Sequence, residues 1–157
     1  MQNDWSNISP TFTCAGVIVI NSKKDKCVIV ITPNGTNAGF PKGKVNKNNG
    51  KRENIFECAK RELFEETGLK FDDLIFVKNL CLNELSNKGN ISIVYLVALY
   101  NDEIEHEFKY DHEELSFSGW KSIEEAKNIL WKERLNLLDL AYSKVIEPEC
   151  EYIKITS

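Results

Sequence analysis

The chain is best understood from one segment, Arg61-Glu62-Leu63-Phe64-Glu65-Glu66-Thr67-Gly68-Leu69, which begins eight residues after Glu53. On a helix, Glu62 and Glu66 lie one turn apart and Glu65 lies three residues after Glu62, so the three carboxylates gather on one side. Like charges at this spacing destabilise a helix unless something neutralises them. Carboxylate oxygens suit a hard cation such as Mg²⁺ or Mn²⁺, and substrate phosphates commonly complete its coordination. The segment therefore predicts a metal site, with Glu62, Glu65 and Glu66 as ligands, that cleaves a phosphate anhydride.

The residues around this segment predict a helix over about 54–67. Asn54 can cap its start, and Glu57 can reach back to complete a capping box. Gly68 is a natural left-handed stop. An apolar stripe at helical spacing would face the core and consists of Phe56, Ala59 and Leu63. The alternative reading is a solvated acidic helix face with one incidental ion pair, and only the flanking residues decide against it.

With those flanks the segment resembles the Nudix box, in which a Gly, five residues and a Glu precede seven residues and Arg-Glu-apolar-x-Glu-Glu-x-Gly-apolar. The match is complete from Glu53 to Leu69. It departs from the family pattern upstream, because nine residues instead of five separate Gly43 from Glu53. We interpret 46–51 as holding a four-residue insertion. The resemblance implies an α/β fold, the α/β/α sandwich around a mixed β-sheet.

Length and composition agree with one compact enzyme domain. The chain has 157 residues, 42% of them hydrophobic and 28% charged, and a net charge of −4. We expect 1–10 to be loosely ordered and 11–157 to form a single Nudix domain. The net charge and the lack of a long basic stripe argue against general nucleic-acid binding.

Cysteine usage and hydropathy predict where the protein works. The five cysteines are scattered and form no Cys-x-x-Cys pair, which argues against zinc and against a disulfide framework. No apolar run approaches the length of a membrane span, and the N-terminus lacks a signal-peptide pattern. We therefore expect a cytoplasmic protein with no membrane partner.

The order of expected elements is also that of an α/β protein. Two β-branched runs predict a hairpin, and two further runs predict a second hairpin around 87–90. A short strand and a long C-terminal helix, ended by Pro148, follow. The expected elements are strands at 14–20, 27–32, 74–85, 91–100 and 117–120, and a helix at 123–146.

The catalytic roles rest on residue type and on the family resemblance. We expect Arg61 to hold a Glu side chain in place and Glu53 to support the same cluster, the alternative for Arg61 being a surface ion pair. In several Nudix relatives the general base is a Glu outside the box, on a loop shortly before a strand with an aromatic residue. Glu114 fits that place best, with Glu113 close behind. In other relatives a box Glu takes this role, and here that residue would be Glu65.

A basic loop before the helix predicts a substrate with several phosphates. Lys42 and Lys44 are the expected phosphate contacts, whereas simple solvated lysines are the alternative. Aromatic residues that could stack on a base, or belong to the core instead, are Phe40, Tyr95, Tyr110 and Trp131, of which Phe40 is the expected platform. The run Phe40-Pro41-Lys42-Gly43-Lys44 resembles asymmetrical diadenosine tetraphosphate hydrolases, diphosphoinositol polyphosphate phosphohydrolases and mRNA-decapping enzymes. The C-terminal pattern is most similar to the first group, which implies a dinucleoside tetraphosphate substrate.

The resemblance also implies partners and leaves one other class of protein open. We expect a monomer that takes a small-molecule polyphosphate, with Mg²⁺ or Mn²⁺ as cofactor, and no nucleic acid except a capped or triphosphate RNA end. The alternative class is a Nudix-fold module that binds a phosphorylated ligand without cleaving it. The complete set of box glutamates favours the enzyme.

Overall fold

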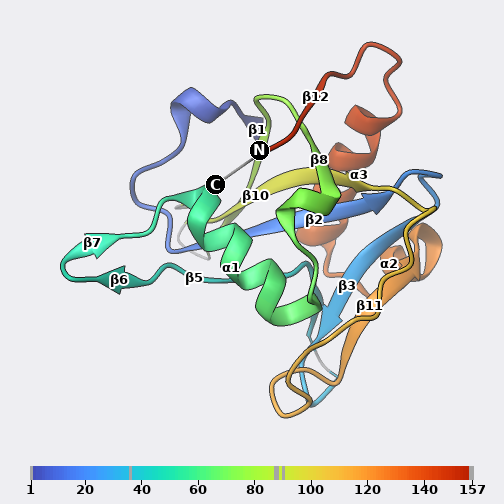
Figure 1. Ribbon diagram of the computed structural model, residues 1–157, viewed down its shortest axis with the longest axis horizontal. Helices are drawn as coiled ribbons and strands as arrows, with labels where there is room; N and C mark the ends of the chain where they lie inside the picture. Colours follow the sequence, from blue (N-terminus) through green and yellow to red (C-terminus); the bar gives the residue numbers. More distant parts are fainter. Residues whose placement is uncertain (1, 36, 87–88, 90, 156–157) are drawn as a thin grey trace.

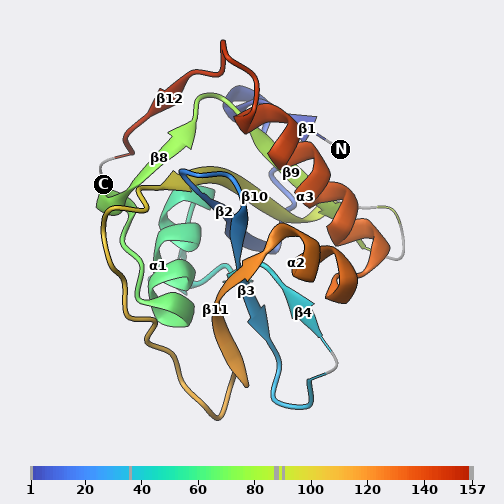
Figure 2. The ribbon, with the colours of Figure 1, turned by 90° about the vertical axis from the view of Figure 1, so that its right-hand side faces the viewer.

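The computed structural model describes residues 2–35, 37–86, 89 and 91–155. Helices cover both faces of a mixed β-sheet, with α1 (Ile55–Thr67) on one face and α2 (Ile123–Ile129) and α3 (Lys132–Val145) on the other (Figures 1 and 2). The predicted α/β/α sandwich is confirmed. No helix within these residues is both long and apolar enough to cross a bilayer.

The sheet is built around one parallel pair, β2 (Cys14–Asn21) and β10 (Ile91–Tyr100). The main strand order is β1-β9-β10-β2-β3-β11, and the other pairs in it are antiparallel. The remaining strands are β1 Gln2–Asn3, β3 Lys26–Ile31, β4 Ala38–Gly39, β5 Lys42–Lys44, β6 Lys47–Asn48, β7 Lys51–Arg52, β8 Leu74–Val77, β9 Cys81–Leu85, β11 Phe117–Ser122 and β12 Tyr152–Ile153, and two 3-10 turns cover Trp5–Asn7 and Phe71–Asp73.

Side-chain alternation along β2 divides the core into two layers. Val17 and Val19 pack with α1, whereas Ile18 and Ile20 pack with α3. Helix α1 begins and ends as predicted. Asn54 and Glu57 form the full capping box, and Gly68 adopts the left-handed conformation at a φ of 78°. The box helix is thus fixed at both ends and by its buried face.

The C-terminal helix differs from the prediction, because it is two helices. Leu130 and Trp131 have extended backbone conformations between α2 and α3. The break places Leu130 in the core and leaves the Trp131 ring on the surface, stacked over the guanidinium of Arg134 at 4.7 Å.

A buried ion pair holds α3 to the sheet, and sequence patterns did not reveal it. Arg134 donates from Nε to Glu84 Oε1 at 3.0 Å and from Nη1 to the carbonyl oxygen of Ala38 at 3.0 Å. The hydroxyl of Tyr95 donates to the same Glu84 oxygen at 3.2 Å. Such a network is costly to break from one side, because a charge would remain buried without its partner. It therefore fixes α3 against β9 and β4.

The second predicted hairpin is confirmed only in part. The run 74–85 splits into β8 and β9, because Asn79 turns the chain with a φ of 63°. Both strands pair with β10. Of the expected turn 87–90, only Gly89 lies within the described residues.

The N-terminal segment is more structured than the prediction of a loosely ordered 1–10. Strand β1 pairs with β9. The indole Nε1 of Trp5 donates to the carbonyl oxygen of Leu80 at 3.1 Å, and its ring meets Phe56 of α1 edge-on at 5.5 Å. The partly buried aromatic ring accounts for the difference, because it anchors a segment that is otherwise polar.

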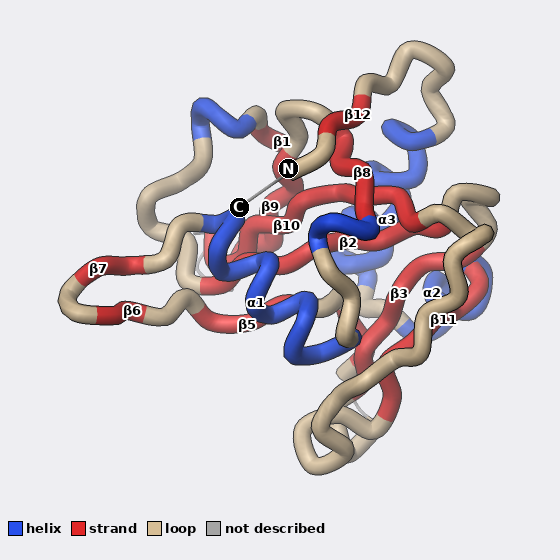
Figure 3. Tube along the Cα trace, viewed as in Figure 1, coloured by secondary structure: helices blue, strands red, loops and turns tan. Residues whose placement is uncertain are grey.

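The insertion forms a β-hairpin of its own. Strands β6 and β7 pair around Asn49 and Gly50, both with positive φ, and the hairpin extends away from the sheet (Figures 1 and 3). The side chain of Arg52 holds its base by donating to the carbonyl oxygens of Pro10 and Phe12. The extra residues are therefore accommodated outside the core.

Candidate active site

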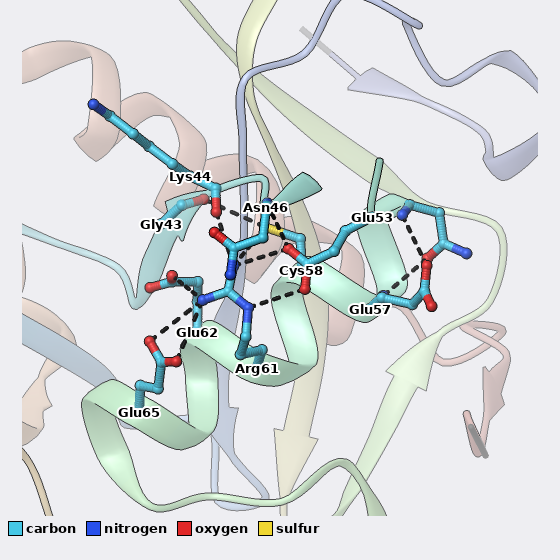
Figure 4. Close-up of polar contacts among 10 residues, drawn as sticks. Gly43, Lys44, Asn46, Glu53, Glu57, Cys58, Arg61, Glu62 and Glu65 are labelled. Carbon is cyan, nitrogen blue, oxygen red and sulfur yellow. Dashed lines mark hydrogen bonds and ion pairs between the residues drawn. The ribbon is translucent and has the colours of Figure 1, made fainter. Parts of the chain in front are cut away.

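Arg61 lies at the centre of the carboxylate cluster (Figure 4). It forms a bidentate pair with Glu53, from Nε to Oε2 and from Nη2 to Oε1, both at 2.9 Å. Its Nη1 donates to Glu62 Oε1 at 2.6 Å and to Glu65 at 3.3 Å, and its Nη2 donates to the carbonyl oxygen of Lys44 at 2.8 Å. The hydrogen bonds from Arg61 hold the pKa of Glu53 below its usual value. One guanidinium thus orients three box glutamates and the preceding loop.

Glu53 also connects this cluster to the insertion. The backbone N–H of Asn46 donates to Glu53 Oε1 at 2.8 Å, and the N–H of Glu53 donates to the carbonyl oxygen of Asn46 at 2.9 Å. The two hydrogen bonds between Asn46 and Glu53 therefore close the base of the inserted hairpin next to Arg61. This explains how the box geometry is kept despite the longer spacing.

Gly43 makes room for Glu62. A Cβ atom at this position would lie 1.9 Å from the carboxyl carbon of Glu62, so any side chain here would displace that carboxylate. The carbonyl oxygen of Gly43 accepts a hydrogen bond from Cys58 Sγ at 3.4 Å, so the loop is held against α1. Burial raises the pKa of the Glu62 carboxyl, and Arg61 opposes that rise. The sequence signal for Gly43 was its place in the Pro-Lys-Gly run, although its contact with Glu62 was not predicted.

Glu66 is the most strongly perturbed carboxylate of the site. Burial raises its pKa to about 7, and the negative charges of Glu62 and Glu114 add to this rise. The backbone N–H of Lys42 donates to Glu66 Oε1 at 2.9 Å, and the Lys42 charge acts in the opposite direction. A carboxyl group held in this way is poorly neutralised by the protein alone.

The cluster fits a hard divalent cation by the chemistry of its donors. Glu62, Glu65 and Glu66 offer only oxygen ligands, and the strain on Glu66 would be relieved by added positive charge. Within the described ranges, no group of three or more His, Cys, Asp or Glu side chains is already gathered tightly enough to hold a metal ion. Glu65 is 54% exposed and contacts Arg61, so its carboxylate is free to turn toward a ligand.

The turn before β11 carries Glu114, the expected base. Glu114 is exposed in a turn that its backbone N–H closes onto the carbonyl oxygen of Asp111 at 3.0 Å. The negative charge of Glu114 contributes to the raised pKa of the Glu66 carboxyl. Glu113 is also exposed, and its N–H is bound by Asp111 Oδ1 at 2.9 Å.

The prediction for Phe40 as a base platform is wrong. Its side chain is fully buried and meets the ring of Tyr95 edge-on at 5.5 Å, within the core beneath α3. An apolar ring that follows the buried strand β4 gains more from the core than from solvent. Trp131 is an exposed aromatic residue, and its ring lies over Arg134, whose Nη1 reaches the carbonyl oxygen of Ala38 in β4.

Comparison with known proteins agrees with this geometry. The family profile described as the NUDIX domain matches residues 10–140. This range is most of the chain, so the chain belongs to the Nudix family. With every box carboxylate present, the predicted enzyme class is confirmed, namely a hydrolase that acts on phosphoanhydride bonds.

Solved structures with this fold include two of an Ap4A hydrolase from C. elegans. One is a binary complex, with 19% identity, a TM-score of 0.68 and coverage of 84% of this chain and 97% of that chain. The other has 20% identity, a TM-score of 0.67 and coverage of 87% and 100%. A NUDIX hydrolase from Nitrosomonas europaea has 17% identity, a TM-score of 0.57 and coverage of 85% and 89%. No curated protein matches the sequence.

Proposed function

We propose that this chain is a metal-dependent pyrophosphohydrolase of nucleoside polyphosphates, with a dinucleoside tetraphosphate such as diadenosine tetraphosphate as substrate. The observation that carries the proposal is the convergence of the box carboxylates on Arg61, beside a buried Glu66 of raised pKa. The Ap4A hydrolase fold similarity supports the choice of substrate.

In this proposal Glu62, Glu65 and Glu66 would hold Mg²⁺ or Mn²⁺. A bound divalent ion neutralises phosphate charge and makes its bound water more acidic. Glu114 accepts the proton of the attacking water, while Arg61 and Glu53 keep the carboxylates oriented. Lys42 and Lys44 attract the phosphate chain.

Trp131, another of the aromatic candidates, is the proposed platform for a base in place of Phe40. Its ring is 51% exposed and is backed by the guanidinium of Arg134. Arg134 is itself fixed by Glu84 and by the carbonyl oxygen of Ala38, so the indole is presented on a rigid support. A ring held in this way suits stacking on one adenine of the substrate.

The experiment that tests the proposed function is a substrate panel with Mg²⁺, in which the released products are identified. The panel contains diadenosine tetraphosphate, a diphosphoinositol polyphosphate, capped RNA and triphosphate RNA. We expect cleavage of the dinucleotide, its loss with chelator and its return with Mg²⁺ or Mn²⁺. Full activity without metal would overturn the mechanism, and binding of the panel members without cleavage would favour a ligand-binding module.

Replacing Arg61 by Lys should disturb the site more than its charge suggests. Lys cannot reproduce the bidentate contact with Glu53 while also reaching Glu62. We expect a loss of kcat/KM of about 10–100-fold, as is usual when residues that orient metal ligands are changed. Arg52→Lys is the matched control. It removes hydrogen bonds to Pro10 and Phe12 instead, and should lower the melting temperature while kcat is kept. Equal activity in both variants would contradict the role of Arg61.

Replacing Lys42 and Lys44 by Ala should raise KM for a tetraphosphate-bridged dinucleotide more than for a short pyrophosphate. The remote phosphates would lose their counter-charges, while the reacting phosphates would keep theirs. Lys23→Ala is the control, because this exposed lysine follows the opposite end of β2 from Lys42 and Lys44. An equal change in KM for both substrates would show that the two lysines are solvated surface residues without a role in phosphate binding.

We also propose that the enzyme acts as a monomer in the cytoplasm. All five cysteines are free thiols, which supports a reducing compartment. Gel filtration with light scattering tests the oligomeric state.

A further inference from the structure

The segment between β10 and β11 passes the C-terminal end of α1 (Figures 2 and 3). Two of its residues are bound there by one carbonyl oxygen. His106 Nε2 lies 2.8 Å from the oxygen of Thr67, and the backbone N–H of Lys109 donates to the same oxygen at 3.2 Å. The last carbonyl groups of a helix have no partner within the helix, so they are available for such contacts.

Gly68, at the helix end, also lies against the segment. A Cβ atom there would be in ordinary van der Waals contact with Lys109 Cβ at 3.4 Å and with His106 Cε1 at 3.5 Å. Just beyond the segment, Ser118 Oγ donates to the carbonyl oxygen of Glu66 at 2.6 Å. The carbonyl groups of Glu66 and Thr67 are therefore both occupied by residues that precede or follow Glu114.

The His106 ring is held by aromatic neighbours. It meets Phe108 edge-on at 4.7 Å and Tyr100 at 6.3 Å, and Phe108 in turn contacts Trp120 at 6.0 Å. The ring is half-buried, so its Nε2 is directed at Thr67 by packing. Space filling alone would not require a ring nitrogen next to the carbonyl oxygen of Thr67.

We propose that His106 is a positioning residue, which fastens the segment bearing Glu114 to the helix end bearing Glu66 and so sets where the base stands relative to the metal ligands. The inference rests on the proposed function. Glu114 lies between the contact at Lys109 and that at Ser116, whose backbone N–H donates to the carbonyl oxygen of Ile31 at 2.8 Å, so loss of the contact at the helix end leaves Glu114 held from its C-terminal side alone.

Three variants separate the hydrogen bond from the packing. His106→Phe keeps an aromatic ring but removes the donor, whereas His106→Gln restores a donor. Glu107→Gln is the control in the same segment, where Glu107 is exposed. We expect His106→Phe to lower kcat for diadenosine tetraphosphate about tenfold, as for other residues that orient a site, with KM changed less than about twofold. His106→Gln should recover most of the loss, and Glu107→Gln should match the parent.

A double-mutant cycle with Glu114→Gln decides whether His106 acts through Glu114. If it does, His106→Phe has little further effect once Glu114 is replaced. An equal loss in both backgrounds, or an unchanged kcat in His106→Phe, would overturn the inference.

Hydrogen exchange at the Lys109 amide gives a readout that is independent of turnover. Exchange should be faster in His106→Phe than in the parent and in Glu107→Gln, and unchanged exchange would overturn the docking itself. A parent protein that cleaves no member of the panel would instead refute the proposed function, and the catalytic part of this inference with it.

Discussion

Replacing Glu66 by Gln is expected to remove at least about 90% of hydrolysis and, at the same time, to stabilise the metal-free protein at alkaline pH. The loss follows because a ligand should matter at least as much as the residues that orient it, whose replacement costs about 10–100-fold. The gain follows because the amide carries no charge, whereas burial makes the charged form of Glu66 unfavourable. Activity and stability therefore move in opposite directions.

The sign of the pH dependence follows from the raised pKa of Glu66. The folded protein holds this proton up to a pKa of about 7, above the ordinary value of 4.5, so the stabilisation is complete below about pH 4.5 and is lost as the pH rises through 7. The upper limit of this loss is about 3 kcal/mol, and residual solvent exposure reduces it. Glu66→Gln lacks this titration and keeps its stability over the same range.

Thermal unfolding in chelator at pH 5 and pH 8 measures the effect. The melting temperature of Glu66→Gln should exceed that of the parent by several degrees at pH 8, with a smaller difference at pH 5. Glu65→Gln is the matched control, because it removes the same charge from the same helix at a largely exposed position. A parent protein as stable as Glu66→Gln at pH 8 would show that the Glu66 carboxyl is not strained.

Glu114→Gln should lower kcat by about a hundredfold or more while metal affinity is kept, which is the usual range for a lost general base. The reason is that its negative charge acts on Glu66, whose pKa it raises, so the carboxylate is near enough to serve the same site. Glu113→Gln removes one charge from the same turn and should have a much smaller effect. Metal affinity, followed by titration of Mn²⁺, separates loss of the base from loss of the ion.

The comparison also has a decisive negative outcome. If neither replacement slows turnover, the base does not lie in this turn. Glu65, which is exposed at the edge of the cluster, then becomes the leading candidate.

Local signals in the sequence were sufficient for the box helix. Asn54 and Glu57 cap its start and Gly68 ends it, and these interactions span only a few residues, so spacing alone predicts them. The two strands of the first hairpin were found for the same reason. The bidentate contact of Arg61 with Glu53 is also local, because these residues lie eight positions apart on and before one helix.

Contacts between distant parts of the chain were not visible in the sequence. Arg134 and Glu84 are 50 residues apart, and neither stands in a pattern that marks it as buried. Phe40 was misassigned because an aromatic residue beside a phosphate-binding loop looks the same whether it faces the core or the solvent. The hairpin at Asn49 and Gly50 did carry a signal, since Asn-Gly is a typical two-residue turn. The longer spacing between Gly43 and Glu53 predicted an inserted loop but not its strands.

The central parallel pair has a consequence for how this protein becomes active during synthesis. Cys14 pairs with Ile93 and Asn21 pairs with Tyr100, so β2 leaves the ribosome long before its partner. Helix α1 lies between the two in sequence and packs mainly on β2, with further contacts to β10. Long-range pairing of this kind forms late, because loop closure must be offset before the contacts form. The box glutamates are therefore synthesised well before the sheet that supports them, and nascent chains shorter than about a hundred residues should lack a fixed carboxylate cluster.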